Sequence, residues 1–226
     1  MQKMRIVKRS LLIVLISLGI SGIASADDWP RWRGPEGDAK CKENGLLQSW
    51  PEGGPELLWE VSGLGAGYSS VSISNGKLYT MGDLEVDSEN AQRVISVDLA
   101  THTILWMRKI GPIHVDDRGG PRCIPTVDGD LVYALGTSGD LACLKTDNGE
   151  IVWRKNLIKD FGGKSAQWKY SESPLVDGDK VLCSPGGLDA ALVALNKKTG
   201  DLFWKAPMPD IVKNGNRDGG YSSFII

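Results

Sequence analysis

Residues Ala194–Trp204 read ALNKKTGDLFW, and two other stretches of the chain repeat the same pattern. Cys143–Trp153 reads CLKTDNGEIVW, and Ser96–Trp106 reads SVDLATHTILW, with a histidine, His102, where the other two copies have glycine. Each copy runs from apolar residues through a polar turn to an apolar pair and a tryptophan. Leu57–Trp59 extends the series, whose tryptophans are Trp59, Trp106, Trp153 and Trp204. Their spacings of 47, 47 and 51 residues indicate a structural repeat.

Glycine-containing turns recur inside the same units. The segments 74–79, 127–132 and 176–181 contain Asn-Gly or Asp-Gly, and we expect positive φ at both central residues of these hairpin turns. The glycines of the repeat are Gly76, Gly129 and Gly178 in the hairpins, and Gly149 and Gly200 before the tryptophans. Apolar and β-branched runs predict strands at 70–74, 131–135, 141–144, 151–154, 181–183 and 191–195. Four short strands per unit predict an all-β protein, a β-propeller of four-stranded blades, and argue against a helical solenoid.

The tryptophans favour packing between blades, because a small twisted sheet cannot bury both of its faces alone. The alternative is a ring of tryptophans that stacks on a ligand. We expect a lead-in at 27–59, blades at 60–106, 107–153 and 154–204, and the start of a fourth blade at 205–226. Closed propellers have about four to eight blades. We therefore expect the chain to be the N-terminal part of a longer protein with about seven or eight blades.

Residues 1–26 have the pattern of a signal peptide: a basic start, an apolar run at Leu11–Ile20 and a small-residue cleavage site at Ala24–Ala26. Cleavage removes four of the 26 basic residues and leaves 28 acidic ones, a net charge of −6. We expect a periplasmic or secreted protein without a transmembrane anchor. Its acidity argues against a nucleic-acid partner. A protein, a carbohydrate or an envelope component remains possible.

The four cysteines are far apart and have no C-x-x-C spacing, which argues against zinc and thioredoxin-like redox sites. Cys143 and Cys183 lie in apolar runs and are predicted to be small buried residues. Export would also permit a disulfide.

The three copies ending in Trp106, Trp153 and Trp204, together with the start Asp28–Pro35 (DWPRWRGP), resemble the pyrroloquinoline quinone (PQQ) propeller superfamily. This resemblance implies a β-propeller over residues 28–226. The superfamily includes PQQ- and calcium-dependent dehydrogenases and non-enzymatic scaffolds such as the assembly factor BamB, so the fold alone does not decide activity. No position matches the catalytic aspartate of the dehydrogenases, and the chain lacks their adjacent cysteine pair. We therefore identify no catalytic and no metal-binding residue.

The long loops that join the blades are the candidate binding sites, because equivalent loops gather at one end of a propeller. They lie at 111–122, 159–172 and 210–220, and their candidates for cofactor binding are Asp116, Asp117, Arg118, Trp168, Arg217 and Asp218. The alternative interpretation is solvated loop charge. His102 is expected to be a solvated turn residue. The alternating acids Asp83, Glu85, Asp87 and Glu89 are interpreted as a soluble hairpin tip, since they lack the spacing of a calcium loop.

Two functions remain open on the residues alone. The first is a non-catalytic exported propeller that binds a partner through its loop face, and the second is a PQQ-dependent alcohol or polyol dehydrogenase. Mild acidity, only two histidines and the missing cysteine pair favour the first.

Overall fold

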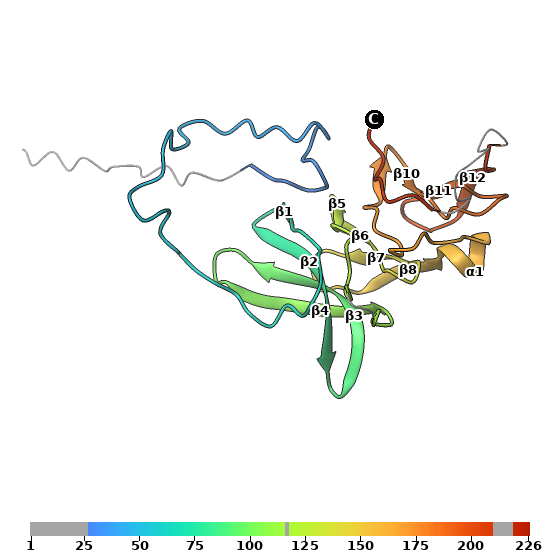
Figure 1. Cartoon of the computed structure of the whole chain (residues 1–226), viewed down its shortest axis with the longest axis horizontal. Helices are drawn as coiled ribbons and strands as arrows, with labels where there is room; N and C mark the ends of the chain where they lie inside the picture. The colour runs from blue at the N-terminus through green and yellow to red at the C-terminus, as the bar shows by residue number, and fades with distance from the viewer. Residues whose placement is uncertain (1–26, 116–117, 210–218) are drawn as a thin grey trace, which may run out of the picture.

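The computed structural model describes residues 27–115, 118–209 and 219–226, so the predicted signal peptide lies outside the described residues. The strands form three antiparallel sheets of four strands each, with the strands in chain order, which confirms the predicted blades (Figure 1). The first blade contains β1 (Ser72–Ser74), β2 (Lys77–Val86), β3 (Glu89–Asp98) and β4 (Thr103–Gly111). The second contains β5 (Thr126–Asp128), β6 (Leu131–Leu135), β7 (Asp140–Lys145) and β8 (Ile151–Asn156). The third contains β9 (Leu175–Asp177), β10 (Lys180–Cys183), β11 (Leu192–Asn196) and β12 (Leu202–Ala206).

A short helix, α1 (Leu157–Phe161), follows β8. The Asn156 side chain accepts hydrogen bonds from two backbone N–H groups of its first turn, and Gly162 ends it with a φ of 64°. Within the described residues, no helix has the length and apolar character needed to cross a membrane.

The hairpin turns agree with the prediction in one blade and correct it in two. Asn75 and Gly76 have φ values of 51° and 71°, as predicted for a turn with two positive φ angles. In the second blade Asp128 pairs with Leu131, so the two turn residues are 129 and 130, and Gly129 supplies the positive φ. The third blade repeats this arrangement at Gly178. Glycine at the first central position accommodates the type II′ turn, and the aspartate before it stays in the strand.

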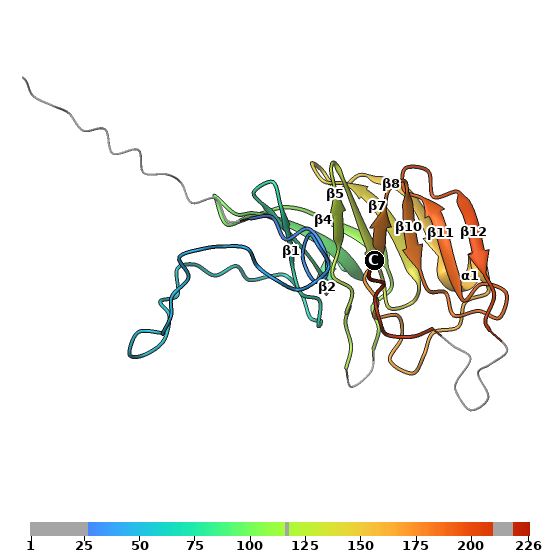
Figure 2. The ribbon, with the colours of Figure 1, turned by 90° about the horizontal axis from the view of Figure 1, so that it is seen from above.

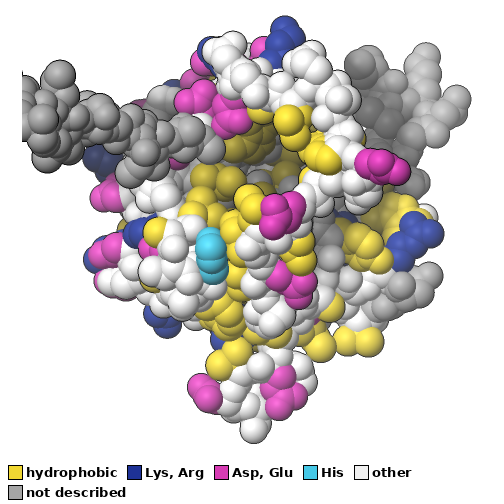
Figure 3. All heavy atoms as spheres, turned by 90° about the vertical axis from the view of Figure 1, so that its left-hand side faces the viewer, with side chains coloured by type: hydrophobic (Ala, Val, Ile, Leu, Met, Phe, Trp, Pro, Cys, Tyr) yellow, Lys and Arg dark blue, Asp and Glu magenta, His cyan; other side chains and the backbone are white. Residues whose placement is uncertain are grey.

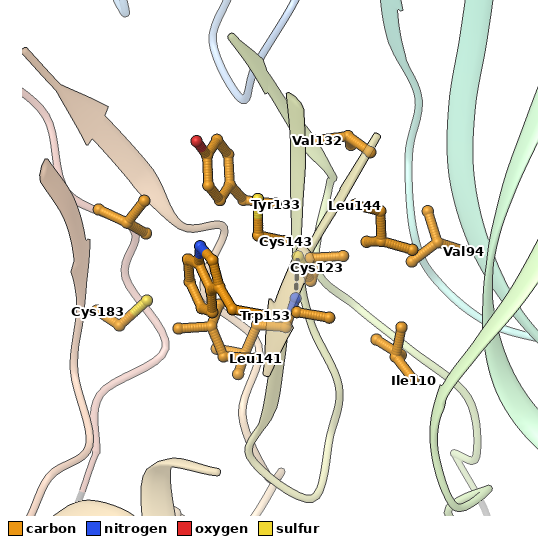
Figure 4. Close-up of a cluster of buried hydrophobic side chains, with 14 of the residues drawn as sticks. Val94, Ile110, Cys123, Val132, Tyr133, Leu141, Cys143, Leu144, Trp153 and Cys183 are labelled. Carbon is orange, nitrogen blue, oxygen red and sulfur yellow. Dashed lines mark hydrogen bonds between the residues drawn. The ribbon is translucent and has the colours of Figure 1, made fainter. Parts of the chain in front are cut away.

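The blades pack face to face, with the innermost strands β1, β5 and β9 next to one another (Figures 1 and 2). The second blade lies between the other two and buries both faces. Figure 4 shows Trp153 pointing toward Cys183 of the third blade, while Leu144 points the other way toward Val94 of the first. One continuous hydrophobic core therefore crosses the blade boundaries.

The repeated tryptophans dock each blade on the next. The indole Nε1 of Trp106 donates to the carbonyl of Thr146, 3.2 Å away, and its ring covers Gly149 in the turn of the second blade. A Cβ atom on Gly149 would lie 2.5 Å from that ring. Trp153 repeats the arrangement on the third blade, where Nε1 donates to a carbonyl at 3.0 Å and the ring covers Gly200. The packing interpretation is confirmed for both tryptophans.

The first tryptophan of the series contacts the equivalent turn of the first blade, where His102 is exposed as expected. The rings of Trp59 and His102 stack with centroids 4.5 Å apart, and His102 has the left-handed φ of 58° that glycine adopts in the other copies. The exposed imidazole also contacts Trp59, because it has a ring face that glycine lacks. Trp59 and Trp204 are 41% and 42% exposed, against 9% for Trp106. Figure 3 shows hydrophobic side chains gathered on the side where the first blade and the N-terminal segment lie.

Candidate functional site

The loops between the blades gather on one side of the sheets, at the lower edge of Figure 2, with the C-terminal segment among them. Two of the predicted candidates meet there. The guanidinium of Arg118 lies 4.8 Å from the ring centre of Trp168, although the two residues belong to different loops. Asp116, Asp117, Arg217 and Asp218 lie outside the described residues.

Two adjoining hollows open at this end, and both are lined by Tyr68 and Arg122. The first has a volume of about 370 Å³ and is completed by Arg118 and Trp168. The second has about 300 Å³ and is lined further by Trp32, Ser70, Ile124, Ser171, Ser173, Tyr221, Ser222 and Ser223. We call the two hollows together the Tyr68–Arg122 cleft. Their volumes are at the lower end of those of small-molecule sites.

Arg122 is held at the centre of this cleft. Its guanidinium lies 5.8 Å from the ring centre of Tyr68, and its terminal nitrogens donate to the carbonyls of Gly120 and Arg118. Tyr68 is 62% exposed, so much of its side chain is open to solvent. An aromatic ring held beside a fixed guanidinium can stack on a flat or cyclic ligand and pair with an anionic group.

The repeat explains why these side chains converge. Tyr68, Arg122 and Ser171 each stand four residues before the first strand of their blade, and Tyr221 belongs to a copy of the Gly-Tyr-Ser-Ser sequence that contains Tyr68. Hydrogen bonds tie the segments side by side. The N–H of Tyr68 donates to Pro121, and the N–H of Ser173 donates to the hydroxyl of Ser223.

The next residue in each blade has a structural role. Ser69 Oγ, Cys123 Sγ and Glu172 Oε1 each accept a hydrogen bond from the backbone N–H twelve residues later, in or directly after the second strand. The distances are 3.3, 3.3 and 2.6 Å. A hydroxyl, a thiol and a carboxylate therefore each bind the segment before the first strand of a blade to the second strand or to the residue after it.

Glu172 is only 1% exposed, and its second carboxyl oxygen has no hydrogen-bond partner within the described residues. Burial raises the pKa of Glu172 to about 7, and the hydrogen bond from Ser184 opposes the shift. Glu172 does not line the cleft, although its chain neighbours Ser171 and Ser173 do.

The cysteines follow the prediction for Cys143 and Cys183, which are fully buried and have free thiols. Burial raises the pKa of Cys143 to about 12, and the pKa of Cys123 reaches the same value for the same reason. A thiol with so high a pKa is a weak nucleophile at neutral pH.

Glu85, Asp87 and Glu89 lie exposed at the predicted hairpin tip, whereas Asp83 lies further inside the β2–β3 ladder, opposite Gln92. β2 and β3 pair up to Val86 and Glu89, and Asp87 has a φ of 52° in the turn. Glu89 forms an ion pair with Lys109, and Asp83 accepts a hydrogen bond from the buried Gln92. Within the described residues, no group of three potential metal ligands comes together.

Four residues that line the cleft were not predicted from the sequence: Trp32, Tyr68, Arg122 and Tyr221. Tyr68 and Tyr221 carried a signal, because the Gly-Tyr-Ser-Ser repeat marks the same place in two blades. No sequence signal marked Arg122, because the second blade has arginine where the first has tyrosine. The equivalence of Arg122 and Tyr68 follows only from the register of the strands that come after them.

Comparison with known proteins identifies the repeats. Residues 90–215, more than half of the chain, match the family described as outer membrane protein assembly factor BamB. The protein of that name from Salmonella typhimurium is 28% identical over 95 residues, which cover 39% of this chain and 21% of that protein. Its counterpart from Yersinia pestis is 26% identical over 124 residues, covering 52% and 31%. A europium-containing methanol dehydrogenase aligns in three dimensions with a TM-score of 0.48 and 18% identity, over 69% of this chain and 28% of that one. The chain thus spans about a fifth to a third of the length of the curated relatives that it matches.

Proposed function

Since the chain belongs to the family of the outer membrane protein assembly factor BamB, we propose that it is an exported, non-catalytic binding protein whose binding surface is the Tyr68–Arg122 cleft. The observation that carries the proposal is the pairing of Arg122 with Tyr68 and of Arg118 with Trp168 at the end where the blade-joining loops meet. Loops on a rigid scaffold are the usual place for binding residues, and the core beneath these loops is continuous.

Export is part of this proposal. The basic, apolar and small-residue regions of residues 1–26 support a cleaved signal peptide and a periplasmic or secreted location. The two named relatives are outer membrane assembly factors, which supports a role at the cell envelope. N-terminal sequencing of the protein from its natural host tests this part, and we expect the mature chain to begin at Asp27.

A PQQ-dependent dehydrogenase is the other function that the repeats allow, and we tested whether the cleft fits it. Calcium prefers several oxygen ligands, with carboxylates prominent among them. No carboxylate is among the described residues that line the two hollows. The described residues therefore do not fit a calcium-bound quinone, and we derive no reaction step through that group.

The binding proposal is tested with the full chain and two variants. Arg122→Gln removes the central cation of the cleft, while Lys145→Gln removes a charge on an exposed β7 side chain that pairs with Glu150 outside the cleft. Each protein is immobilised and exposed to envelope extract from the host. We expect wild type and Lys145→Gln to retain the same ligand and Arg122→Gln to lose it. Equal retention by all three proteins would contradict the proposal.

A dye-reduction assay with PQQ, calcium and alcohols addresses catalysis separately. We expect no PQQ-dependent reduction by the wild-type protein. PQQ-dependent turnover that falls in Arg122→Gln would show that the cleft is an enzyme site.

A further inference from the structure

We infer that residues 28–35 form a latch, which fastens the inner strands of the first two blades and sets one wall of the Tyr68–Arg122 cleft. This N-terminal latch goes beyond the proposed function and does not depend on it, because it is defined by contacts within the chain. The inference draws on the path of the segment, on the contacts that hold it, and on the position of Trp32.

The latch crosses from one blade to the next along their inner strands. Trp29 and Ile73 of β1 exchange two backbone hydrogen bonds, both of 2.9 Å. The carbonyl of the next residue, Pro30, accepts a hydrogen bond from the N–H of Val127 in β5 at 2.8 Å. Consecutive residues therefore hold two different blades, and a displacement of the segment breaks both contacts together.

Asp28 anchors the start of the latch. Its carboxylate accepts hydrogen bonds from the hydroxyl of Ser74 at 2.9 Å and from the N–H of Asn75 at 3.1 Å. Both donors belong to the hairpin between β1 and β2. Hydrogen bonds to an ionised acceptor are stronger than those between neutral groups, so Asp28 is the contact whose loss should release the latch.

The far end of the latch is folded on itself. The ring of Trp29 covers Gly34, where a Cβ atom would lie 2.8 Å from the ring. The side chain of Arg31 donates to the carbonyls of Gly34 and Pro35, at 3.2 and 2.7 Å. Because these contacts lie within the latch, they persist when it leaves the blades. We therefore expect it to dock and to leave as one unit.

The latch carries Trp32 into the wall of the cleft. Trp32 lines the hollow of about 300 Å³ and also a smaller recess that it shares with Ser173, Ser223 and Phe224. No other residue of 28–35 is among the described residues that line the cleft. Release of the latch would therefore remove Trp32 from the wall and widen the cleft.

The hydrophobic core does not depend on the latch. The buried cluster that crosses the three blades includes Tyr79, Trp106 and Trp153, and no residue of 28–35 is part of it. A segment that contributes nothing to the core can open locally at a smaller free-energy cost than global unfolding. The latch is therefore a two-state element that can open while the blades stay folded.

The experiment measures amide hydrogen exchange in the full chain by NMR. Ile73 and Val127 report on the latch, because their N–H groups donate to it. Lys145 reports on the blades, because its N–H donates to Glu150 within the second blade. Fluorine NMR of the chain labelled with 5-fluorotryptophan reports on the cleft wall, and the Trp32 signal is assigned with Trp32→Phe.

The variants remove the anchor in graded steps. Asp28→Ala removes both acceptor oxygens, whereas Asp28→Asn keeps one of them without the charge. Ser74→Ala removes a single donor to Asp28 and is the mildest change. Asp189→Asn is the matched control, because Asp189 is an exposed aspartate of the third blade outside the latch.

In Asp28→Ala we expect exchange at Ile73 and at Val127 to be about tenfold faster or more, by the same factor at both sites. Exchange at Lys145 should stay within about twofold of wild type, since the blades remain folded. Asp28→Asn and Ser74→Ala should have smaller effects of the same kind, and Asp189→Asn should match wild type. The Trp32 signal should move in the variants that release the latch.

Three outcomes would overturn the inference. Unchanged exchange at Ile73 and Val127 would show that Asp28 does not hold the segment. Faster exchange at one of the two sites alone would show that the contacts open independently. An unchanged Trp32 signal beside faster exchange at both sites would show that the latch does not set the cleft wall.

If Asp28→Ala unfolds the blades, exchange at Lys145 rises as well, and Ser74→Ala then decides by the same criteria. The experiment contains no ligand. Its failure therefore leaves the proposed binding function standing, and a failure of the envelope-extract comparison leaves the latch standing.

Discussion

Trp59 stacks on His102 in the place where Trp106 covers Gly149 and Trp153 covers Gly200. In each contact a tryptophan from one unit lies on a turn residue of the next that has a left-handed φ. Leu57–Trp59 therefore occupies the position that the outer strand of a blade has in the other units. At His102 the tryptophan packs on an imidazole ring, whereas at Gly149 and Gly200 it packs on the backbone of a glycine.

Substitution of His102 separates its two contributions. His102→Ala keeps the left-handed φ, which costs an L-residue about 1–2 kcal/mol, and loses the stack, worth about 0.5–1.5 kcal/mol. His102→Gly loses the stack and relieves the backbone. Both variants should be cleaved faster than wild type by a Glu-specific protease at Glu56 and Glu60. In urea only His102→Ala should be less stable, by about 1 kcal/mol. Unchanged cleavage would show that the stack does not hold the segment.

The repeated tryptophans should differ in their contribution to stability. Trp153 is 8% exposed and donates a hydrogen bond to the third blade, whereas Trp204 is 42% exposed. Trp153→Ala should lower the free energy of unfolding by about 3–5 kcal/mol, because it leaves a cavity and removes one of the two hydrogen bonds to the Lys197 carbonyl, the other coming from Tyr133. Trp204→Ala should cost less than half as much in this chain. Urea denaturation followed by circular dichroism measures both values, and equal losses would contradict the docking role.

Gly149 and Gly162 provide a matched test of the close contact under Trp106. Both have left-handed φ, 68° and 64°, but a Cβ on Gly149 would meet the indole ring, and a Cβ on Gly162 would meet no atom within 4 Å. Gly162→Ala should cost about 1–2 kcal/mol from the backbone alone. Gly149→Ala should cost at least about 2 kcal/mol more, since the ring must move out of a close-packed interface. Similar losses in thermal unfolding would show that the ring moves freely.

Glu172 predicts a pH dependence of stability. Because burial raises its pKa to about 7 from an ordinary value of 4.5, the folded protein keeps the proton after the unfolded chain has lost it. Stability is therefore highest below about pH 4.5 for this group and falls as the pH rises to about 7, by about 3 kcal/mol. Glu172→Gln keeps an acceptor for Ser184 and has no charge to bury. It should be more stable than wild type at pH 8 and similar at pH 4.

Urea titrations of both proteins from pH 4 to pH 8 measure this difference. A gap between variant and wild type that does not change with pH would show that Glu172 does not titrate in this range.

The fold could be predicted from the sequence because its signals are local and repeated. The tryptophan pattern and the glycine turns gave the strands around 131–135 and 151–154 with small shifts at their ends. The turn at Gly129 was placed one residue early, because the sequence does not tell which side of the glycine the strand ends on. The contact between blades at His102 was missed, since it joins residues 43 positions apart.

The candidate site was only partly predictable. Arg118 and Trp168 were singled out for their loops, and the structure brings them together. Arg122 and Tyr68 were not, because they stand at equivalent positions in different blades with unrelated chemistry. Their proximity depends on how the blades pack, and no local pattern encodes that packing.

The series Ser69, Cys123 and Glu172 has a wider consequence. One hydrogen-bonding task, receiving an N–H twelve residues downstream, is met by a hydroxyl, a thiol and a carboxylate. The three repeats therefore share the same hydrogen bond, although the residue that accepts it differs from one repeat to the next. Two repeats can then have the same structure at a position where a sequence alignment shows a mismatch. Residue identity therefore underestimates the similarity between the blades of one chain.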